Sequence, residues 1–515
     1  MPEAPGRYPF RHCVLFIQKS HFYAKKILTL TAKLFFVKNE TLRDEVASYI
    51  VEGSRGALPL LEQMLQGEAT AVSRRHLARL IDDIFLEKPV TDLRRITDHH
   101  AEPINGLLVE PLIAHAHRNR LRILVAQIVP VQGHEVLVWS DRKGTRWWAS
   151  LESNGGLDGA LTELRDLCGP GIILIPHGDI RLRIDAAVAH DGVEIADYLH
   201  KPLPFTPGTW VETDSTEAHR HLDQLEAESI RIIREAVANA SKPAMLFSLG
   251  KDSMVMWALA KKAFSPEPPP IPLALIDSRW EFQEVYQVLN YIRSEPGTTL
   301  LVHTNPEAIE KDVNPFDFGS AGHTDITRTQ ALRQFLNLER FDFIFGGGRR
   351  DEERSRAKER VFSLRNEHHG WDPKTQRPEL WNVFNTALPK NHSMRVFPLS
   401  NWTELDVWRY IQREQIPVVP LYFSKTRPFV ERDGALIAID DDRFRLDADE
   451  RVYFEPIRFR TLGCYPLTGG ERSSASTVAD IIRELETTRV SERSSRVIDA
   501  DPGASMEQKK KEGYF

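Results

Sequence analysis

A short polar segment, Ser248–Ser253 with the sequence SLGKDS, carries residue types that can hold an anion. It follows the apolar run Ala244–Phe247, and a segment of helical character begins at Met254. A tight turn from a strand into a helix directs backbone N–H groups and the positive end of the helix at one point. Gly250 permits unusual backbone angles and a close approach to a ligand, Lys251 adds positive charge, and the serines add hydroxyl donors. We therefore expect this loop to hold a pyrophosphate, although an ordinary β–α turn has a similar composition.

A second polar segment begins with three glycines and two arginines. Gly346–Gly348 follow an apolar run, and Arg349 and Arg350 come next. Glycines at a strand end allow the backbone to approach an anion, and guanidinium groups can bind that anion bidentately. The alternative is a solvated helix with i,i+4 pairs such as Glu352 with Arg356. The first loop favours the anion site, and further cations follow at Arg354, Arg356 and Lys358.

Other polar groups give weaker signals. Asp277 ends the second predicted strand, where a carboxylate can accept hydrogen bonds from a ribose or an amino group. The segment His323–Asp325 is expected in a loop, where it could add polar contacts. For both, a capping or turn role is an equal alternative. No metal site is predicted at His99, His100, His115 and His117, which lack acidic or cysteine partners at useful spacing.

Short apolar runs alternate with helical segments after residue 216. The runs are Ala244–Phe247, Ile271–Ile276, Leu300–His303, Phe341–Phe345 and Met394–Phe397. Alternation of this kind predicts βαβ units, that is, an α/β fold with a doubly wound parallel sheet. Ligands of such sheets bind outside the carboxyl ends of the strands, and both polar segments directly follow a run. A charged amphipathic helix, Glu217–Asn239, precedes the first run.

The N-terminal part has a different organisation, and no function is assigned to it. Its first half is predicted to be helical and its second half to form a small α/β unit. The expected helices are Thr41–Val51, Leu58–Leu65, Val72–Phe85 and Leu157–Leu167, and the expected strands are Arg122–Val131, Glu135–Asp141, Thr145–Leu151 and Gly171–Pro176. Three prolines and a glycine in Lys201–Thr216 mark a boundary. We therefore expect an N-terminal region at 1–205, a linker at 206–216 and a second domain at 217–515.

Composition narrows the class of protein. The chain has 515 residues, of which 41% are hydrophobic and 27% charged, as in a soluble protein of two or three domains. The net charge of -6 argues against a general nucleic-acid-binding protein. Lysines interrupt the basic, apolar stretch at 12–38, so we expect neither a membrane span nor a secretory signal. Cys13, Cys168 and Cys464 form no CxxC pair, which argues against a disulfide framework or thiolate zinc site and fits a reducing cytoplasm.

The loop Ser248–Ser253 resembles the SxGKDS pyrophosphate loop of the PP-loop ATP pyrophosphatase superfamily. Within it, residues 225–515 resemble the small, catalytic subunit of the heterodimeric bacterial sulfate adenylyltransferase, or ATP sulfurylase. The matching stretches are Gln224–Glu235, Gly346–Arg360, Trp371–Trp381, Phe397–Trp408, Arg458–Gly469 and Ser505–Phe515. The family's aspartate-threonine-glycine-tryptophan at the second strand end is Asp277-Ser278-Arg279-Trp280 here, and Tyr465 stands where tryptophan is expected. Residues 1–216 have no counterpart in the family.

The resemblance implies a reaction in which sulfate attacks the α-phosphorus of ATP, giving adenosine 5′-phosphosulfate and pyrophosphate. ATP with Mg²⁺ would be bound at Ser248, Gly250, Lys251, Asp252, Ser253 and Asp277. Sulfate and the developing charge would be held by Arg349 and Arg350, helped by Arg354, Arg356 or Lys358, and the catalytic residues would be Lys251, Arg349 and Arg350. Because sulfate has no proton to lose at neutral pH, positioning and neutralisation of charge should suffice for catalysis.

The resemblance also implies a partner chain. The family couples this uphill reaction to GTP hydrolysis by a separate large subunit, and this sequence has no GxxxxGK[ST] loop of its own. A phosphoadenylyl-sulfate reductase-like enzyme stays an alternative. Such reductases use a late cysteine in an acid-cysteine-glycine context, whereas Cys464 lies between Gly463 and Tyr465. A non-catalytic nucleotide-sensing module is the second alternative, which Arg279 slightly favours and the intact Lys251 disfavours.

Overall fold

The computed structural model describes residues 40–52, 73–86, 88–184, 192–211, 216–352 and 356–487. The chain divides into two compact units, Met1–His200 and Lys201–Phe515, each with a hydrophobic core of its own. The predicted helix at 58–65, the basic stretch at 12–38 and the chain after residue 487 lie outside the described residues. The linker at 206–216 stays a prediction.

The first unit is built on a five-stranded mixed sheet with the order β3-β2-β1-β4-β5. Its main elements are α3 (Arg74–Phe85), α4 (Val109–Asn119), β1 (Arg122–Val131), β2 (His134–Asp141), β3 (Arg146–Ser150), α5 (Leu157–Cys168), β4 (Ile172–Pro176), α6 (Ile180–Arg183) and β5 (Val193–Ile195). β1, β2 and β3 form an antiparallel meander, and β4 and β5 run parallel to β1. The strands predicted in this half are confirmed, and β5 is an additional short strand.

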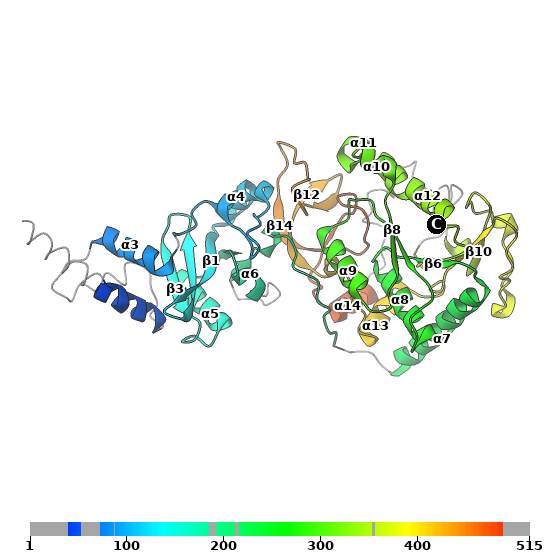
Figure 1. The fold of residues 1–515 in the computed structure, drawn as a ribbon, viewed down its shortest axis with the longest axis horizontal. Coiled ribbons are helices and arrows are strands. Elements are labelled where there is room, and N and C mark those ends of the chain that lie inside the picture. Colours follow the sequence, from blue (N-terminus) through cyan, green and yellow to red (C-terminus); the bar gives the residue numbers. More distant parts are fainter. Residues whose placement is uncertain are drawn as a thin grey trace, which may run out of the picture. The chain divides into compact units, whose positions relative to one another are not determined.

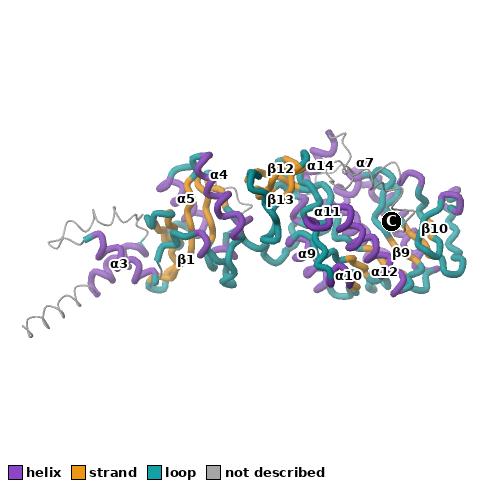
Figure 2. The backbone as a smooth tube through the Cα atoms, turned by 90° about the horizontal axis from the view of Figure 1, so that it is seen from above, coloured by secondary structure: helices purple, strands orange, loops and turns teal. Residues whose placement is uncertain are grey.

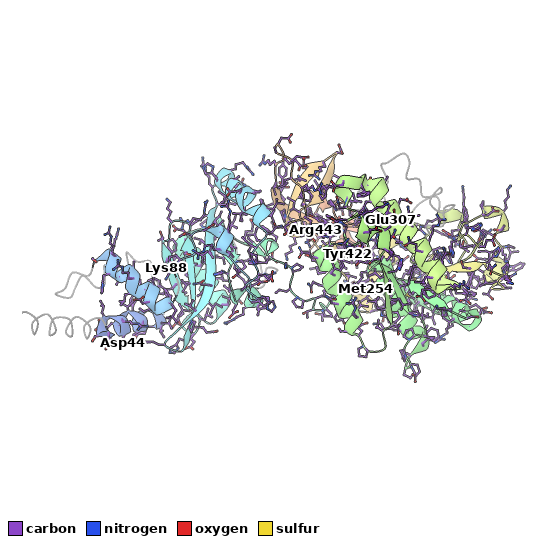
Figure 3. All side chains as sticks on the ribbon, turned by 45° about the horizontal axis from the view of Figure 1, so that its top comes forward. Asp44, Lys88, Met254, Glu307, Tyr422 and Arg443 are labelled. Carbon is purple, nitrogen blue, oxygen red and sulfur yellow. The ribbon has the colours of Figure 1, made fainter. Side chains whose placement is uncertain are left out.

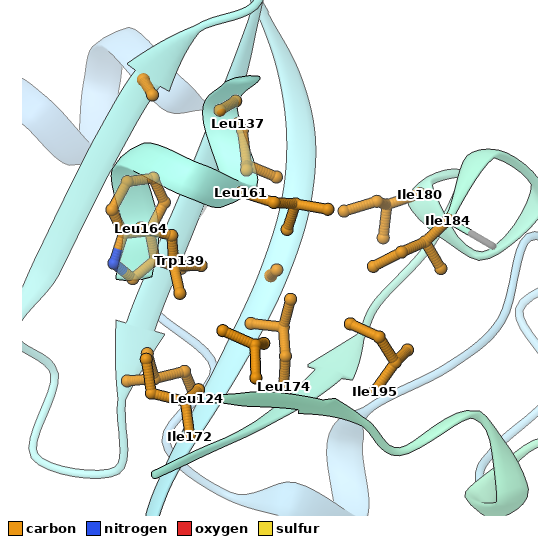
Figure 4. Close-up of a cluster of buried hydrophobic side chains, with 14 of the residues drawn as sticks. Leu124, Leu137, Trp139, Leu161, Leu164, Ile172, Leu174, Ile180, Ile184 and Ile195 are labelled. Carbon is orange, nitrogen blue, oxygen red and sulfur yellow. The ribbon is translucent and has the colours of Figure 1, made fainter. Parts of the chain in front are cut away.

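Hydrophobic layers cover both faces of this sheet. On one face, Trp139 of β2 packs with Leu161 and Leu164 of α5 (Figure 4). On the other face, Val138 of β2 and Trp148 of β3 pack against α3 and a helix at 40–51. Successive side chains of a strand point to opposite faces, so a strand buried on both faces has a nearly continuous apolar sequence.

The second unit contains a six-stranded sheet with the order β10-β11-β9-β6-β7-β8. Its strands are β6 (Pro243–Leu246), β7 (Leu273–Ile276), β8 (Leu300–His303), β9 (Phe343–Phe345), β10 (Phe362–Arg365) and β11 (Ser393–Val396). The predicted parallel sheet is confirmed for β6, β7, β8, β9 and β11, each of which coincides with one predicted apolar run. The edge strand β10 pairs antiparallel with β11 and was not predicted.

Helices lie on both sides of this sheet (Figure 1). They are α7 (Thr216–Asn239), α8 (Lys251–Phe264), α9 (Gln283–Ser294), α10 (Pro306–Glu310), α11 (Pro315–Thr324), α12 (Ala331–Glu339), α13 (Glu404–Arg413) and α14 (Val478–Thr487). On one face, Leu332 and Phe335 of α12 pack on Ala244 and Ile344 of the sheet. The order of strands reverses between β6 and β9, so the carboxyl ends of these two strands form the switch point where such folds bind ligands.

A separate antiparallel sheet was not predicted. It has the order β13-β12-β14-β15 and consists of β12 (Lys425–Arg432), β13 (Ala435–Ala438), β14 (Tyr453–Arg458) and β15 (Glu471–Arg472). β12 and β13 are seen as neighbouring orange strands in Figure 2. The segment before this sheet supplies Tyr422, and the connection between β14 and β15 supplies Arg460; both residues belong to the candidate site described below.

The prediction that His323–Asp325 form a loop was wrong. His323 lies near the end of α11 and is fully buried, and α11 continues into a π-helical turn at Asp325–Gln330. The side chain of Asn314 accepts hydrogen bonds from the first backbone N–H groups of α11, and Pro315 occupies its first turn. An asparagine cap followed by proline starts a helix as readily as it marks a turn, which explains the error.

No helix in the described ranges combines the length and the apolar character that crossing a bilayer requires.

Candidate active site

The first loop has the strand–turn–helix geometry expected of it. α8 begins at Lys251, earlier than the predicted start at Met254, and Gly250 is its N-cap residue. The left-handed residue of the turn is Leu249, with a φ of 60°, whereas Gly250 is extended with a φ of -66°. A Cβ at Gly250 would lie 3.6 Å from the Tyr422 hydroxyl. This is an ordinary contact distance, and Gly250 does not supply the unusual backbone angle that was predicted for it; its close approach to a ligand stays a prediction.

Lys251 is held inside the protein by acceptors from other segments. Its side chain is 2% exposed, and its backbone N–H donates to the hydroxyl of Tyr422 at 2.8 Å (Tyr422 is labelled in Figure 3). Its ammonium lies 3.6 Å from the Asp252 carboxylate and 3.9 Å from the Glu404 carboxylate. The same ammonium donates to the carbonyl oxygen of Arg460 at 3.4 Å. The lysine predicted to meet the pyrophosphate thus has its orientation set by three segments distant in the sequence.

The second loop touches the first. A Cβ at Gly347 would lie 3.1 Å from Cβ of Asp252 and 3.6 Å from the backbone nitrogen of Ser253. Arg349 is 1% exposed, and its Nε lies 2.7 Å from the Asp252 carboxylate. The Gly346 N–H donates to the Val396 carbonyl at 2.9 Å, which ties the loop to the end of β11. The structure therefore brings Lys251, Asp252 and Arg349 together, as the strand-end argument predicted.

The remaining predicted cations have different positions. Arg350 is half-buried, its backbone N–H donates to Ser400 at 3.0 Å, and its guanidinium donates to Asn401. Arg356 is buried, and its guanidinium would collide with a Cβ at Gly348, so it adjoins the second loop. Lys358 is exposed, and Arg354 lies outside the described residues.

Asp277 follows β7 at the same edge of the sheet. Its carboxylate accepts hydrogen bonds from the Arg279 N–H at 2.8 Å and from the Tyr286 hydroxyl at 2.9 Å. Burial and the neighbouring Asp277 raise the pKa of Tyr286, so this phenol stays a hydrogen-bond donor. Asp277 is thus only half-buried and orders its own turn, which agrees with the turn role that the sequence left open.

The turn after Asp277 explains one departure from the family pattern. Arg279 stands at the position of the family's glycine and has a left-handed φ of 64°. Its side chain is directed to the exposed Asp312, 3.7 Å away. Its carbonyl accepts from Arg443 at 2.8 Å, and that guanidinium stacks 4.3 Å above the ring of Trp280. The arginine therefore keeps the backbone conformation that glycine adopts without strain.

Sequence reasoning assigned no role to Glu404, Tyr422 or Arg460. Glu404 makes two contacts with other segments of the site. Its N–H donates to Asp351 at 3.2 Å, and its carboxylate lies 2.8 Å from the Arg460 guanidinium. Glu404 opens α13, whose N-terminus has a capping box with Thr403. That local signal, six residues after the predicted strand that ends at Phe397, could have placed Glu404 near the ligand-binding edge of the sheet. No local pattern marks Tyr422 or Arg460.

Cys464 is not placed as a redox nucleophile. It is buried and lies between the Arg328 guanidinium at 3.2 Å and the Ser278 hydroxyl at 3.5 Å. Burial raises the pKa of its thiol, and a thiol rather than a thiolate is a poor nucleophile. This disfavours the reductase alternative.

The comparisons with known proteins agree with this geometry. Residues 242–470 match the model of the phosphoadenosine phosphosulfate reductase domain family. Sulfate adenylyltransferase subunit 2 of Caulobacter vibrioides is 58% identical over 295 residues, which are 57% of this chain and 95% of that protein. The protein of the same name from Sulfurimonas denitrificans is 57% identical over 300 residues, covering 58% of this chain and 99% of the relative.

Likeness to solved structures is low. A phosphoadenylyl-sulfate reductase from Candida auris, with phosphate, has 15% identity and a TM-score of 0.28 over 42% of this chain and 93% of its own. The Candida glabrata FMN adenylyltransferase with ATP has 14% identity and a TM-score of 0.30 over 56% of this chain and 91% of its own. TM-scores this low do not support a conclusion about this chain. The relatives named sulfate adenylyltransferase subunit 2 are 57–58% identical over nearly their whole length. The chain therefore belongs to the sulfate adenylyltransferase subunit 2 family.

Proposed function

We propose that the second unit transfers the adenylyl group of ATP to sulfate, forming adenosine 5′-phosphosulfate and releasing pyrophosphate. The observation that carries this proposal is the direct contact between the two loops, where Lys251 and Arg349 converge on Asp252. Both cations follow the ends of adjacent parallel strands, where doubly wound sheets bind their ligands. The family membership gives the reaction class.

The proposed chemistry needs positive charge and alignment rather than a general base. A sulfate oxygen forms a bond to the α-phosphorus of ATP, and the bond from that phosphorus to the leaving pyrophosphate breaks. The loop at Ser248–Ser253 and Lys251 would take the charge that develops on the pyrophosphate, and Arg349 would face the entering sulfate. Because Lys251 and Arg349 are already oriented by Asp252 and Glu404, little reorganisation is needed during the reaction.

Magnesium would enter with ATP. The described residues contain no group of three or more metal-ligating side chains, and Mg²⁺ commonly binds through substrate phosphates with one or two carboxylates and water. Asp252, at the first turn of α8, is the carboxylate placed beside the proposed phosphate site. Bound Mg²⁺ would neutralise phosphate charge there.

We further propose that the chain works with a GTPase large subunit in the cytoplasm. The name of the relatives, subunit 2, indicates an enzyme of more than one subunit. Forming a phosphosulfate anhydride from a phosphoanhydride is strongly uphill, so net synthesis needs a second source of energy. GTP hydrolysis on the partner would supply it.

The test is formation of adenosine 5′-phosphosulfate from radiolabelled sulfate by the full chain with its large subunit, ATP, Mg²⁺ and GTP. Lys251→Ala should lower product formation by roughly 100-fold or more, as expected for loss of a charge-stabilising group. Lys261→Ala is the matched control, because Lys261 lies on the same helix, is half-exposed and forms an ion pair with Glu295. Near-normal synthesis by Lys251→Ala, with native circular dichroism, would refute the assignment of the loop. ATP binding without any synthesis would favour the nucleotide-sensing module instead.

A further inference from the structure

Arg395 of β11 is a buried cation without a hydrogen-bond partner. Its side chain is 0% exposed, and none of its three guanidinium nitrogens has a partner among the described residues. Burial and the nearby Arg365 lower its pKa to about 9. An unpaired charge in the interior is strongly unfavourable, so its presence calls for a group that supplies both acceptors and negative charge.

A second unpartnered donor lies on the same side of the sheet. In the antiparallel register of β10 and β11, Arg395 pairs with Ser363 and Ser393 pairs with Arg365. Paired residues and residues two apart on a strand share a face, so all four side chains lie on one face. The buried hydroxyl of Ser393 also has no partner, whereas Arg365 donates to Glu359 at 2.6 Å.

Guanidinium groups outnumber carboxylates among the described side chains of this cluster. Its guanidinium groups are Arg356, Arg365 and Arg395, and its carboxylates are Glu352 and Glu359. Among these five side chains, three guanidinium groups face two carboxylates. The positive potential extends to His369, where burial, followed by the charges of Arg395 and Arg333, lowers the pKa to about 4. Water could satisfy the N–H groups, but only an anion also compensates the charge.

The cluster adjoins the second loop of the candidate site. Arg395 directly precedes Val396, whose carbonyl accepts from Gly346 at 2.9 Å. Arg356 of the cluster packs closely on Gly348, where an added Cβ would lie 2.3 Å from Nη1 of its guanidinium. Arg395 is one residue from the carboxyl end of β11, whereas Ser393 and its partner Arg365 lie at the amino end of that strand. The cluster reaches the second loop through Arg356.

We propose that Arg395, with Arg365 and the Ser393 hydroxyl, binds the sulfate substrate. The planar fork of a guanidinium matches two oxygens of a tetrahedral oxyanion, and a buried hydroxyl adds a third donor. This inference rests on the proposed function and adds a binding group to it. A phosphate group of ATP has similar chemistry, so the experiment compares the two ligands.

The experiment measures binding of sulfate and of pyrophosphate to the full chain by isothermal titration calorimetry, without nucleotide or partner. Arg395→Met keeps the volume of the side chain and removes the charge, and Arg395→Lys keeps the charge and removes the fork. Both variants should bind sulfate at least 10-fold more weakly and pyrophosphate within about 2-fold of the unmodified chain. Arg413→Met is the control, since Arg413 is also largely buried but fully paired with Asp223, Glu226 and Glu414.

Thermal unfolding gives a second readout that a merely structural role would not produce. In chloride, Arg395→Met should be at least as stable as the unmodified chain, because an unpaired charge is removed. Arg413→Met should be less stable, because it removes the ion pairs with Asp223, Glu226 and Glu414. Unchanged sulfate binding by Arg395→Met would overturn the inference, and so would loss of pyrophosphate binding alone. Loss of stability of Arg395→Met in chloride, to the level of Arg413→Met, would also count against it.

The two proposals can fail separately. The calorimetry measures sulfate binding without ATP and without the large subunit, so its result does not depend on whether the chain forms product. If sulfate binds through Arg395 but no adenosine 5′-phosphosulfate forms, the proposed function is wrong and the anion site stands. If product forms with an unchanged KM for sulfate in Arg395→Lys, the function stands and this inference is wrong.

Discussion

Replacing Gly347 with alanine tests the close approach of the two loops. The added Cβ would lie 3.1 Å from Cβ of Asp252, 3.5 Å from its carbonyl carbon and 3.6 Å from the backbone nitrogen of Ser253. These atoms belong to the first turn of α8, so no rotamer change can relieve the shortest contact. Either α8 or the second loop must move.

The size of the effect follows from that contact. Relaxed carbon–carbon contacts are about 3.5–4.0 Å, so the loops must separate by roughly 0.5 Å. Overpacking of this kind typically costs about 1–3 kcal/mol, which lowers the melting temperature by about 2–10 °C in a domain of this class. The shift also disturbs the 2.7 Å contact between Arg349 and Asp252. Since a misplacement of about 1 Å can cost about 100-fold in rate, we expect kcat to fall by roughly 10-fold.

The assay combines thermal unfolding of the chain with synthesis of adenosine 5′-phosphosulfate at varied ATP concentration. Gly322→Ala is the control, because a Cβ there meets only Cβ of Phe318 at 3.7 Å, an ordinary contact inside α11. The control should keep its activity and be neutral or slightly more stable, since alanine is favoured over glycine in a helix. If Gly347→Ala matched this control in both melting temperature and kcat, the two loops would not depend on their close approach.

Three further predictions concern other parts of the second unit. Arg279→Gly should raise the free energy of unfolding by up to about 1 kcal/mol, because it relieves a left-handed arginine with a φ of 64°; a loss of stability in urea denaturation would contradict this. Burial raises the pKa of Asp440 to about 7 from 3.8, so the folded state holds a proton that the unfolded state releases, and stability should decline as the pH rises from about 4 to 7. Asp440→Asn should remove that decline, so its stability relative to the unmodified chain should improve between pH 5 and pH 8; an unchanged difference would refute the assignment. A truncated chain that starts at Lys201 should melt at a higher temperature than one that starts at Asp214, because the Trp210 N–H groups donate to Gln415 at 2.7 Å and to Ile416 at 3.2 Å, and equal melting temperatures would show that these contacts contribute nothing.

The sequence determined the parallel sheet of the second unit and the position of its two polar loops. Each parallel strand is a short apolar run bounded by turn residues or helical segments, and this pattern is local. Parallel strands in one sheet share an edge, so the sequence placed both polar segments at the same edge of the sheet. The contact of Asp252 with Arg349 also requires β6 and β9 to be neighbours, which the tertiary structure decided.

Other local signals were read incorrectly. The sequence shows a glycine in the first loop, but it does not show that Leu249 rather than Gly250 takes the left-handed conformation. Likewise, Asn314 and Pro315 suit both a turn and a helix N-terminus, and the burial of the following helix decided in favour of the helix. Local propensities of this kind are small compared with the energy of tertiary packing.

Only the tertiary structure decided how the candidate site is completed. The sheet formed by β12 to β15 depends on partners far apart in sequence, such as Lys425 with Ile457. Its two longest strands, β12 and β14, contain proline and charged residues and so show no continuous apolar run. That sheet sets the positions of Tyr422 and Arg460 beside Lys251, and the pairing of β10 with β11 sets Arg395 beside Arg365. Whether a buried arginine finds a carboxylate depends on which distant segments surround it, and periodicity along the chain carries no information about that.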